Sequence, residues 1–321
     1  MTTPIQRALE QLSAVILGKE EQLKLALSCL LARGHLLIED LPGMGKTTLS
    51  HALAGVLGLQ YNRIQFTSDL LPADILGVSI FERENGSDVG RFRFHPGPVF
   101  TQLLLADEIN RAPAKVQSAL LEAMAERQIT VGSKTYPLPP LFLVMATQNP
   151  LEQEGTYPLP EAQLDRFLMH VDIDYPDAQT ELEILRLTRG EALSAPPVTP
   201  PTLSQEDIFS ARKAALSLHM APELEQYLVQ LIMATRKPER FDANLAQWIA
   251  LGTSPRATIS LDKCARAHAW LAGRDFVGPD DIQAVAHNVL RHRIILSYEA
   301  EAEGVTVNDV LDKIVATVAV P

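Results

Sequence analysis

The feature that most constrains this fold is a regular alternation of short apolar runs with helical patterns through roughly the first 190 residues. The helical patterns repeat apolar side chains at three- and four-residue intervals, and the apolar runs have the short length of buried strands. We predict helices at Ile5–Leu12, Glu20–Ala32, Thr47–Leu57, Ala114–Glu126 and Ala178–Arg189, and strands at His35–Ile38, Tyr61–Phe66, Gln102–Ala106, Leu141–Thr147 and His170–Ile173. Strands that alternate with helices predict an α/β fold with a parallel sheet covered on both faces.

Two segments break this alternation and predict β-hairpins. Val78–Glu82 and Arg91–His95 flank Asn85-Gly86, a dipeptide that accepts the positive φ angles of a tight turn. The segment Ile129–Tyr136 has a second turn at Gly132-Ser133. Spacing alone leaves open whether these hairpins are functional inserts or surface loops.

A proline-rich stretch divides the chain. Pro196, Pro197, Pro200 and Pro201 lie within residues 191–201, and proline cannot continue a helix because it lacks an N–H donor. Beyond this linker we predict helices at Ser204–Leu218, Pro222–Arg236, Arg256–Leu271 and Pro279–Leu290. We therefore expect one domain over residues 1–190 and a smaller, all-helical domain over residues 202–321.

Charge and cysteine content argue against several kinds of function. The chain has 28 Lys and Arg against 39 Asp and Glu, a net charge of −11, which disfavours broad capture of a nucleic-acid backbone. Only Cys29 and Cys264 are present, so neither a disulfide framework nor a CxxC metal site is expected. No run approaches the roughly 18 apolar residues of a membrane-spanning helix. We expect a soluble, cytoplasmic protein.

A phosphate-binding loop is predicted directly after the first strand. The run Pro42-Gly43-Met44-Gly45-Lys46-Thr47 leads into a helix, so that backbone N–H groups converge on phosphate oxygens at a helix N-terminus. Lys46 would neutralise the phosphates, the Thr47 hydroxyl would hold Mg²⁺, and Thr48 is a further candidate for nucleotide binding. The full pattern has glycine where this chain has Asp40, whose side chain we expect to point outward.

Acidic and amide residues follow two later strands. Asp107 and Glu108 end one apolar run, at the sheet edge where ligands bind in parallel sheets. Asp107 would hold Mg²⁺ through a coordinated water, and Glu108 would orient and polarise an attacking water. Asn149 closes the next predicted strand and would lie beside Glu108 if the two strands are neighbours. Taken alone, an Asp-Glu or Asn-Pro pair is an ordinary turn, but the upstream phosphate loop favours hydrolysis.

Together these residues resemble the MoxR family of AAA+ ATPases. The resemblance rests on GHLLIED at 34–40, DEINRAP at 107–113, ATQNP at 146–150, LPEAQLDRF at 159–167 and SPRA at 254–257, and it extends from about Val15 to the end. It implies a P-loop AAA+ nucleotide-binding domain with a five-stranded parallel sheet, flanking helices and β-hairpin inserts. A smaller all-helical lid domain would follow. The cofactors would be ATP and Mg²⁺.

The same resemblance assigns roles to further residues. Asn149 resembles the sensor of the γ-phosphate, Arg166 the arginine finger that reaches a neighbouring subunit, and Arg256 the second sensor, acting in cis or in trans. Ile16-Leu17-Gly18 corresponds to the adenine-contacting segment, although Lys19 stands where glutamine is common. Without the resemblance, both arginines have plainer readings: Arg166 as a helix-end ion pair and Arg256 as a surface charge.

The resemblance also implies partners. It predicts a homo-oligomeric ring, expected to be a hexamer, that remodels or matures a partner protein bearing a von Willebrand factor A domain, in some cases by inserting a metal cofactor. The hairpins would line a pore or bind a partner. Two alternatives remain open: a nucleic-acid motor related to replicative helicases, and a nucleotide-gated scaffold without useful turnover.

Overall fold

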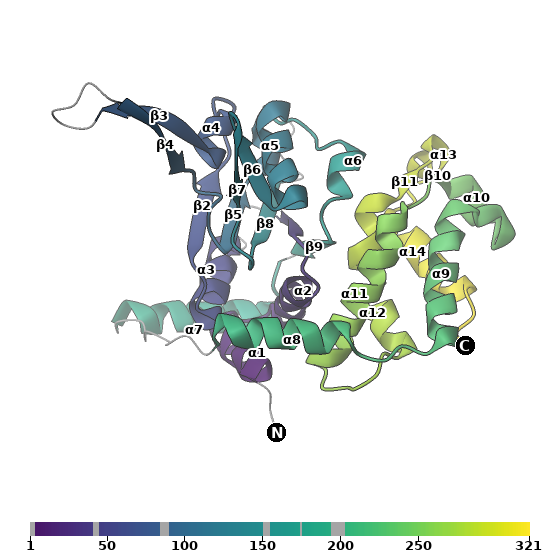
Figure 1. The fold of residues 1–321 in the computed structure, drawn as a ribbon. Helices are drawn as coiled ribbons and strands as arrows, with labels where there is room; N and C mark the ends of the chain where they lie inside the picture. The colour runs from purple at the N-terminus through teal and green to yellow at the C-terminus, as the bar shows by residue number, and fades with distance from the viewer. Residues whose placement is uncertain (1–3, 41–44, 84–89, 150–154, 174, 194–202) are drawn as a thin grey trace. The chain divides into compact units, whose positions relative to one another are not determined.

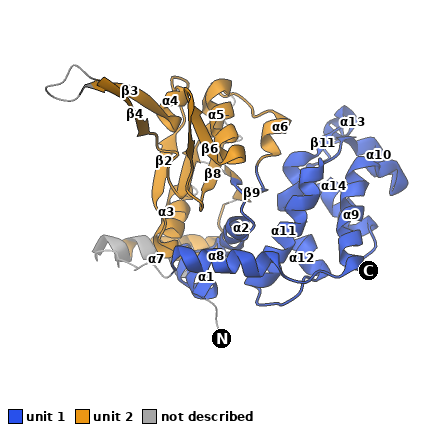
Figure 2. Cartoon of the chain, in the orientation of Figure 1, with its two compact units in different colours: residues 1–36, 167–171, 203–321 blue, residues 37–166, 172–202 orange. Residues whose placement is uncertain are grey.

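The computed structural model describes residues 4–40, 45–83, 90–149, 155–173, 175–193 and 203–321. The chain divides into two compact units, each coloured separately in Figure 2. Unit 1 comprises residues 1–36, 167–171 and 203–321, and unit 2 comprises residues 37–166 and 172–202. None of the helices in the described ranges is both long and apolar enough to cross a bilayer.

A five-stranded parallel sheet forms the framework for the acidic strand ends. Its strands are β1 (Leu36–Asp40), β2 (Tyr61–Gln65), β5 (Leu103–Asp107), β8 (Leu143–Gln148) and β9 (Met169–Ile173), and their order is β2-β5-β8-β1-β9. The interior strand β5 is buried at every residue, as expected of a strand covered on both faces. The sheet confirms the predicted α/β class, and β5 and β8 are neighbours, as the reading of Asn149 required.

The remaining elements of unit 2 are helices and two hairpins (Figure 1). The helices are α3 (Lys46–Leu57), α4 (Pro72–Leu76), the 3₁₀ turn η1 (Ile109–Arg111), α5 (Ala114–Glu126), α6 (Glu161–Leu164) and α7 (Ala178–Leu193). The hairpins pair β3 (Gly77–Arg83) with β4 (Gly90–Pro96) and β6 (Gln128–Val131) with β7 (Lys134–Pro137). Both predicted hairpins are confirmed. The turn at Gly132-Ser133 is described, whereas Asn85-Gly86 lies outside the described residues.

Unit 1 is helical except for one short antiparallel pair and for its residues of β1 and β9, which are Leu36 and 169–171. Its helices are α1 (Pro4–Val15), α2 (Glu20–Leu31), α8 (Gln205–Leu216), α9 (Pro222–Arg236), the 3₁₀ turn η2 (Pro238–Arg240), α10 (Ala243–Trp248), α11 (Pro255–Leu271), α12 (Pro279–Leu290), the 3₁₀ turn η3 (Arg291–Arg293), α13 (Tyr298–Ala302) and α14 (Val307–Thr317). Strands β10 (Ile249–Leu251) and β11 (Ile295–Leu296) pair with each other. The helical lid is confirmed, and this small ribbon is its departure from the all-helical expectation.

The N-terminal helices pack with the C-terminal ones. Within unit 1, α11 contacts α2, α8, α9 and α12. The fully buried Arg212 of α8 donates a hydrogen bond from Nε to the Leu30 carbonyl oxygen at the end of α2, at 2.9 Å. The two units are therefore not consecutive stretches of the chain, because residues 1–36 group with the lid. In addition, α7 continues to Leu193, past the predicted boundary at 190. The scheme 1–190, 191–201 and 202–321 stays a prediction, and residues 194–202 of its linker are not described.

The two cysteines are free thiols inside unit 1. Cys29 of α2 and Cys264 of α11 are both buried. Burial raises the pKa of the Cys264 thiol to about 12 and that of Cys29 well above its usual value. Because the thiolate is the reactive form, these side chains behave as small apolar core residues.

A buried carboxylate joins α11 to α12. Asp281 is fully buried and accepts a hydrogen bond from the Gly278 N–H at 2.8 Å. Its Oδ1 also lies 2.7 Å from His268 Nδ1, and the carboxylate forms an ion pair with Arg274. The carboxylate thus holds the last turn of α11, the connecting loop and the first turn of α12 together.

We expect Asp281→Asn to destabilise unit 1 by about 2 kcal/mol, because it removes the buried charge that accepts from Arg274, although the Arg274 side chain itself is 35% exposed. Both tryptophans, Trp248 and Trp270, lie in unit 1, so their fluorescence during urea unfolding reports this unit. The matched control is Asp309→Asn, because Asp309 caps α14 in the same way from an exposed position. A loss for Asp281→Asn no larger than that of the control would contradict the structural role of the Asp281 contacts.

Candidate nucleotide site

The site is organised around the carboxyl ends of β5 and β8. Asp107 is the last residue of β5, and its side chain is only 4% exposed. The buried Thr147 hydroxyl on β8 donates to Asp107 Oδ1 at 2.7 Å and accepts from the Glu108 N–H at 2.9 Å. One hydroxyl therefore fixes the positions of both acidic residues, because β5 and β8 run side by side.

Two cations approach Asp107. Lys46 Nζ lies 3.5 Å from Oδ1, and Arg63 Nη2 on β2 lies 2.6 Å from Oδ2. Burial raises the pKa of the Asp107 carboxyl, but hydrogen bonds from Thr147 and Arg63 and the charges of Lys46 and Arg63 outweigh burial and lower the pKa below its usual value. Asp107 is therefore an ionised carboxylate near neutral pH.

Glu108 has an unusual backbone conformation. Its φ and ψ are 57° and 51°, the left-handed region that non-glycine residues rarely adopt. Its Oε2 accepts a hydrogen bond from Gln65 Nε2 at 2.8 Å and forms an ion pair with Arg111 Nε at 2.9 Å. Strained residues held by their surroundings cluster at functional sites, so this conformation supports a functional role for Glu108.

The turn after Glu108 is fixed from α5. Buried Gln117 donates hydrogen bonds from Nε2 to the carbonyl oxygens of Ile109, at 3.2 Å, and of Tyr157, at 2.9 Å. The Tyr157 N–H in turn donates to the Asn110 carbonyl oxygen at 2.6 Å. Gln117 thereby ties the acid-bearing turn to the segment that follows β8.

The described end of the phosphate loop has the predicted form. Gly45 has a φ of 76° and directly precedes α3, which begins at Lys46. Glycine accepts this left-handed angle without strain. Thr47 is half-buried and Thr48 is exposed in the first turn of α3. Pro42, Gly43 and Met44, with the predicted outward side chain of Asp40, lie outside what the structure describes.

The residues present fit an Mg²⁺ ion. Mg²⁺ takes oxygen ligands and is commonly held by one or two carboxylates together with substrate phosphates. The ionised Asp107 carboxylate and the Thr47 hydroxyl are donors of this kind. The approach of Lys46 to Asp107 within 3.5 Å brings the predicted phosphate-binding lysine and the predicted metal carboxylate together.

The other predicted site residues are distributed over both units. Asn149 is buried directly after β8. In unit 2, Arg166 Nη1 donates to the Leu121 carbonyl oxygen of α5 at 2.9 Å. Arg256 is exposed in the first turn of α11 in unit 1. Ile16, Leu17 and Gly18 follow α1 in the same unit, and Ile16 is buried. The roles assigned to all of these residues stay predictions.

Four residues that contact Asp107, Glu108 or both were not predicted from the sequence: Arg63, Gln65, Arg111 and Thr147. A signal for two of them was present, because Arg63 and Gln65 flank the buried Ile64 on β2 and so share one face of the strand. A polar pair on one face of an apolar strand indicates a site near its carboxyl end. Thr147 belongs to the ATQNP motif at 146–150, but its contact with the two acids could not be predicted without knowing that β8 lies next to β5.

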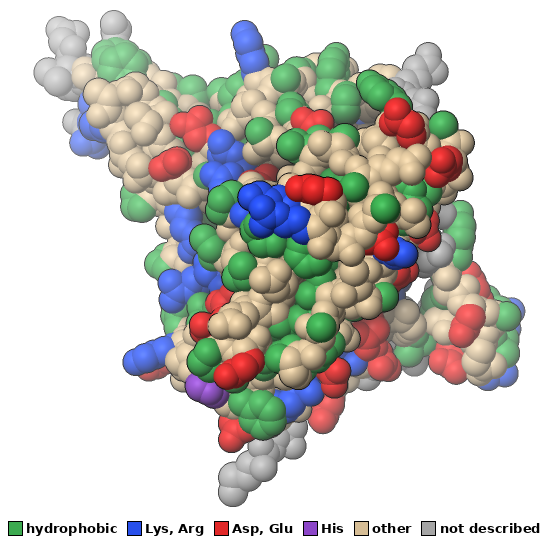
Figure 3. Space-filling model, turned by 90° about the vertical axis from the view of Figure 1, so that its right-hand side faces the viewer, with side chains coloured by type: hydrophobic (Ala, Val, Ile, Leu, Met, Phe, Trp, Pro, Cys, Tyr) green, Lys and Arg blue, Asp and Glu red, His purple; other side chains and the backbone are tan. Residues whose placement is uncertain are grey.

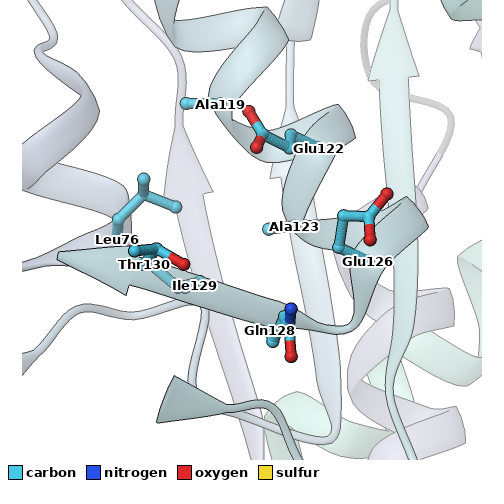
Figure 4. Close-up of a pocket in the computed structure, with 8 residues that line it drawn as sticks. All are labelled: Leu76, Ala119, Glu122, Ala123, Glu126, Gln128, Ile129 and Thr130. Carbon is cyan, nitrogen blue, oxygen red and sulfur yellow. The ribbon is translucent and has the colours of Figure 1, made fainter. Parts of the chain in front are cut away.

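A small surface cavity elsewhere in unit 2 does not fit a nucleotide. Its volume is about 130 Å³, and Figure 4 shows it between α5, Leu76 and the start of β6. This volume is below the roughly 300 Å³ of small ligand pockets. Glu122 and Glu126 of α5 line it, and their charges would repel phosphates.

Comparisons with known proteins agree with this geometry. The ATPase family associated with various cellular activities (AAA) matches residues 35–169, and an AAA lid domain matches residues 243–314. The Mycobacterium tuberculosis protein named Chaperone MoxR1 is 43% identical over 320 residues, covering 99% of this chain and 82% of that protein. Protein MoxR of Paracoccus denitrificans is 37% identical over 327 residues, covering 97% and 94%. A solved structure of a candidate ATPase from Cytophaga hutchinsonii is 42% identical, has a TM-score of 0.91 and covers 99% and 95%.

Proposed function

Because this chain belongs to the MoxR family of AAA+ ATPases, we propose that it is an Mg²⁺-dependent ring ATPase that remodels a partner protein. ATPase activity and a chaperone-like role follow from the family. Mg²⁺ dependence, ring assembly and the partner are the proposed additions. The observation that carries the Mg²⁺ dependence is the convergence of Lys46 and Thr147 on the ionised Asp107, with Glu108 directly after it.

The residues divide the work of hydrolysis among them. Lys46 neutralises phosphate charge at the start of α3, and Asp107 with Thr47 holds the cation. Mg²⁺, when bound, supplies further neutralisation of the phosphates. Glu108 accepts a hydrogen bond from the attacking water and orients it towards the γ-phosphate. Asn149 holds the same water through its neutral amide.

A second set of roles is proposed for residues away from the acidic strand ends, and only Arg166 among them is proposed to act across a subunit interface. Arg166 is proposed as the arginine finger of a ring, expected to be hexameric, and its guanidinium would exchange the Leu121 carbonyl for a neighbour's γ-phosphate. Arg256 is proposed as the second sensor, and Ile16, Leu17 and Gly18 as the adenine-contacting segment. The described chain has no membrane-spanning helix, and we propose that the protein works in the cytoplasm.

The two hairpins are the proposed client surface. A cavity of about 530 Å³ lies between them, lined by Ser79, Arg91, Phe92, Val131, Gly132, Ser133, Lys134 and Tyr136. Phe94 stacks on Tyr136 with ring centroids 4.0 Å apart, which fixes the first hairpin against the second. Further along the same face, Phe81 and Phe92 are 50% and 71% exposed. Exposed aromatic side chains at a cavity are typical of protein contact surfaces.

A trapping experiment tests the client role. We expect Glu108→Gln, loaded with ATP, to retain a von Willebrand factor A domain protein from the same organism on an affinity column. Adding Phe92→Ala should reduce retention by roughly tenfold, because a central aromatic anchor typically contributes about 1 to 2 kcal/mol. Tyr298→Ala is the matched control, since Tyr298 is an exposed aromatic residue of unit 1. Equal retention by the Phe92 and Tyr298 variants would remove the hairpins from client binding.

One observation favours a second candidate, a nucleic-acid motor. The hairpin cavity combines Arg91 and Lys134 with Phe92 and Tyr136, and cations beside aromatic rings also suit single-stranded nucleic acid. Against it stand the net charge of −11 and the face in Figure 3, where acidic, basic and apolar side chains are interspersed. ATP turnover that DNA stimulates, with steep loss at higher salt, would favour this candidate over protein remodelling. Very slow ATP turnover that neither a partner protein nor DNA stimulates would favour a nucleotide-gated scaffold.

A further inference from the structure

Arg63 contacts the nucleotide site, but the proposed mechanism of hydrolysis gives it no role. Strands β2 and β5 are parallel neighbours, with Arg63 opposite Leu105 and Gln65 opposite Asp107. The Arg63 side chain therefore extends along the sheet towards the carboxyl end. Its Nη2 donates to Asp107 Oδ2 at 2.6 Å and to Gln65 Oε1 at 2.9 Å.

These contacts make one chain of interactions through the site. Asp107 is bound to Arg63, Arg63 to Gln65, and Gln65 to Glu108 at 2.8 Å. Arg63 is thus the link between the carboxylate proposed for the metal and the carboxylate proposed for the attacking water. It is also the closest cation to Asp107, since Lys46 lies 3.5 Å away.

The charges around Asp107 set Arg63 in competition with a metal ion for the carboxylate. A single carboxylate, 4% exposed, faces the positive charges of both Lys46 and Arg63. When Lys46 turns to the phosphates, Arg63 still neutralises the buried carboxylate. A divalent ion at that carboxylate would meet the guanidinium at close range, where like charges repel strongly. The Arg63 side chain is 45% exposed, so it has a path into solvent.

We propose that Arg63 is an internal competitor of Mg²⁺, which holds Asp107 in the metal-free state and has to leave it when metal and nucleotide bind. The inference rests on the proposed Mg²⁺ dependence and adds a residue that sets its strength. Arg63 acts through Asp107 and is therefore a positioning residue, which does not have to contact the reacting atoms.

The test compares nucleotide binding with and without metal. The dissociation constant of the fluorescent nucleotide mant-ADP is measured in excess EDTA and again in excess Mg²⁺. The dissociation constant in EDTA divided by that in Mg²⁺ gives the coupling between metal and nucleotide. In Arg63→Gln we expect this ratio to rise roughly fivefold, the effect of removing one partly exposed ion pair from the cost of metal binding. Arg63→Lys should stay closer to the parent, because it keeps the charge.

Three further variants make the result decisive. Arg93→Gln removes an equally charged side chain from the first hairpin, where Arg93 pairs with Glu82, and should leave the ratio unchanged. Asp107→Asn should bring the ratio close to one, and adding Arg63→Gln to it should have no further effect. Thermal unfolding by circular dichroism verifies that each variant folds.

The outcomes separate this inference from the proposed function. A ratio in Arg63→Gln that equals or falls below the parent's, with Mg²⁺-linked binding intact in the parent, overturns the role of Arg63 alone. A parent that binds mant-ADP equally well in EDTA and in Mg²⁺ overturns the Mg²⁺ dependence as well. A similar fivefold rise in Arg93→Gln would assign the effect to general charge.

Discussion

Glu108→Gln is expected to lower the rate of ATP turnover by about 10²- to 10⁴-fold, the usual contribution of a general base, while nucleotide binding persists. Glutamine keeps the size of the side chain and can still accept the hydrogen bond from Gln65, which now lies at 2.8 Å. It loses the negative charge that attracts a proton from the attacking water. Steady-state phosphate release measures the turnover, and mant-ATP fluorescence measures the binding.

The matched control for this variant is Glu122→Gln. Glu122 is an exposed acid on α5 that lines the small cavity of Figure 4, and the same loss of charge there should leave turnover at the parent rate. Equal rates in Glu108→Gln and the parent would remove Glu108 from the reaction. Loss of nucleotide binding in Glu108→Gln would instead indicate that its contacts with Gln65 and Arg111 shape the site.

Arg166→Ala is the second large effect that we expect. An arginine finger contributes about 10³- to 10⁵-fold to turnover, because it stabilises the charge that develops on the transferred phosphoryl group. Nucleotide binding within one subunit should persist, since the finger belongs to the neighbouring site. Loss of binding along with turnover would argue against a finger that acts in trans.

Subunit mixing gives this prediction a sharper form. Arg166→Ala keeps an intact nucleotide site, and Lys46→Ala keeps an intact finger, so neither variant alone should turn over ATP. Mixed in equal amounts, they should recover about a quarter of the parent rate, the fraction of random interfaces that pair an intact site with an intact finger. The structure offers a competing role, because Arg166 donates to the Leu121 carbonyl of α5. In that case mixing would restore nothing, and Arg166→Ala would unfold at a lower temperature.

Local sequence patterns predicted much of the fold and part of the site. Apolar runs placed all five strands of the main sheet within two residues of their observed ends. Ser204 and Ser254, residue types that favour helix starts, accept hydrogen bonds from the first turns of α8 and α11. Lys46 and Asp107 were each predicted to act on the bound nucleotide, and their side chains lie 3.5 Å apart.

Contacts between distant strands were beyond those patterns. Thr147 joins Asp107 and Glu108 only because β8 lies next to β5, and Arg63 reaches Asp107 only because β2 lies on the other side of β5. Strand order depends on how the whole chain buries its apolar faces, and no run of consecutive residues contains it. The β10–β11 ribbon escaped notice for a related reason, since strands of two or three residues carry no readable period.

The amino-acid sequence by itself determined where strands and helices form, where the lysine-bearing loop enters α3, and which strand ends in adjacent acids. These are properties of neighbouring residues, set by side-chain periodicity, glycine conformations and helix-start chemistry. Tertiary structure alone decided that Arg63, Gln65 and Thr147 surround the acids, and that residues 1–36 pack with the C-terminal helices. Those arrangements follow from packing between segments far apart in the chain, where burial of apolar surface and neutralisation of buried charge select the partners.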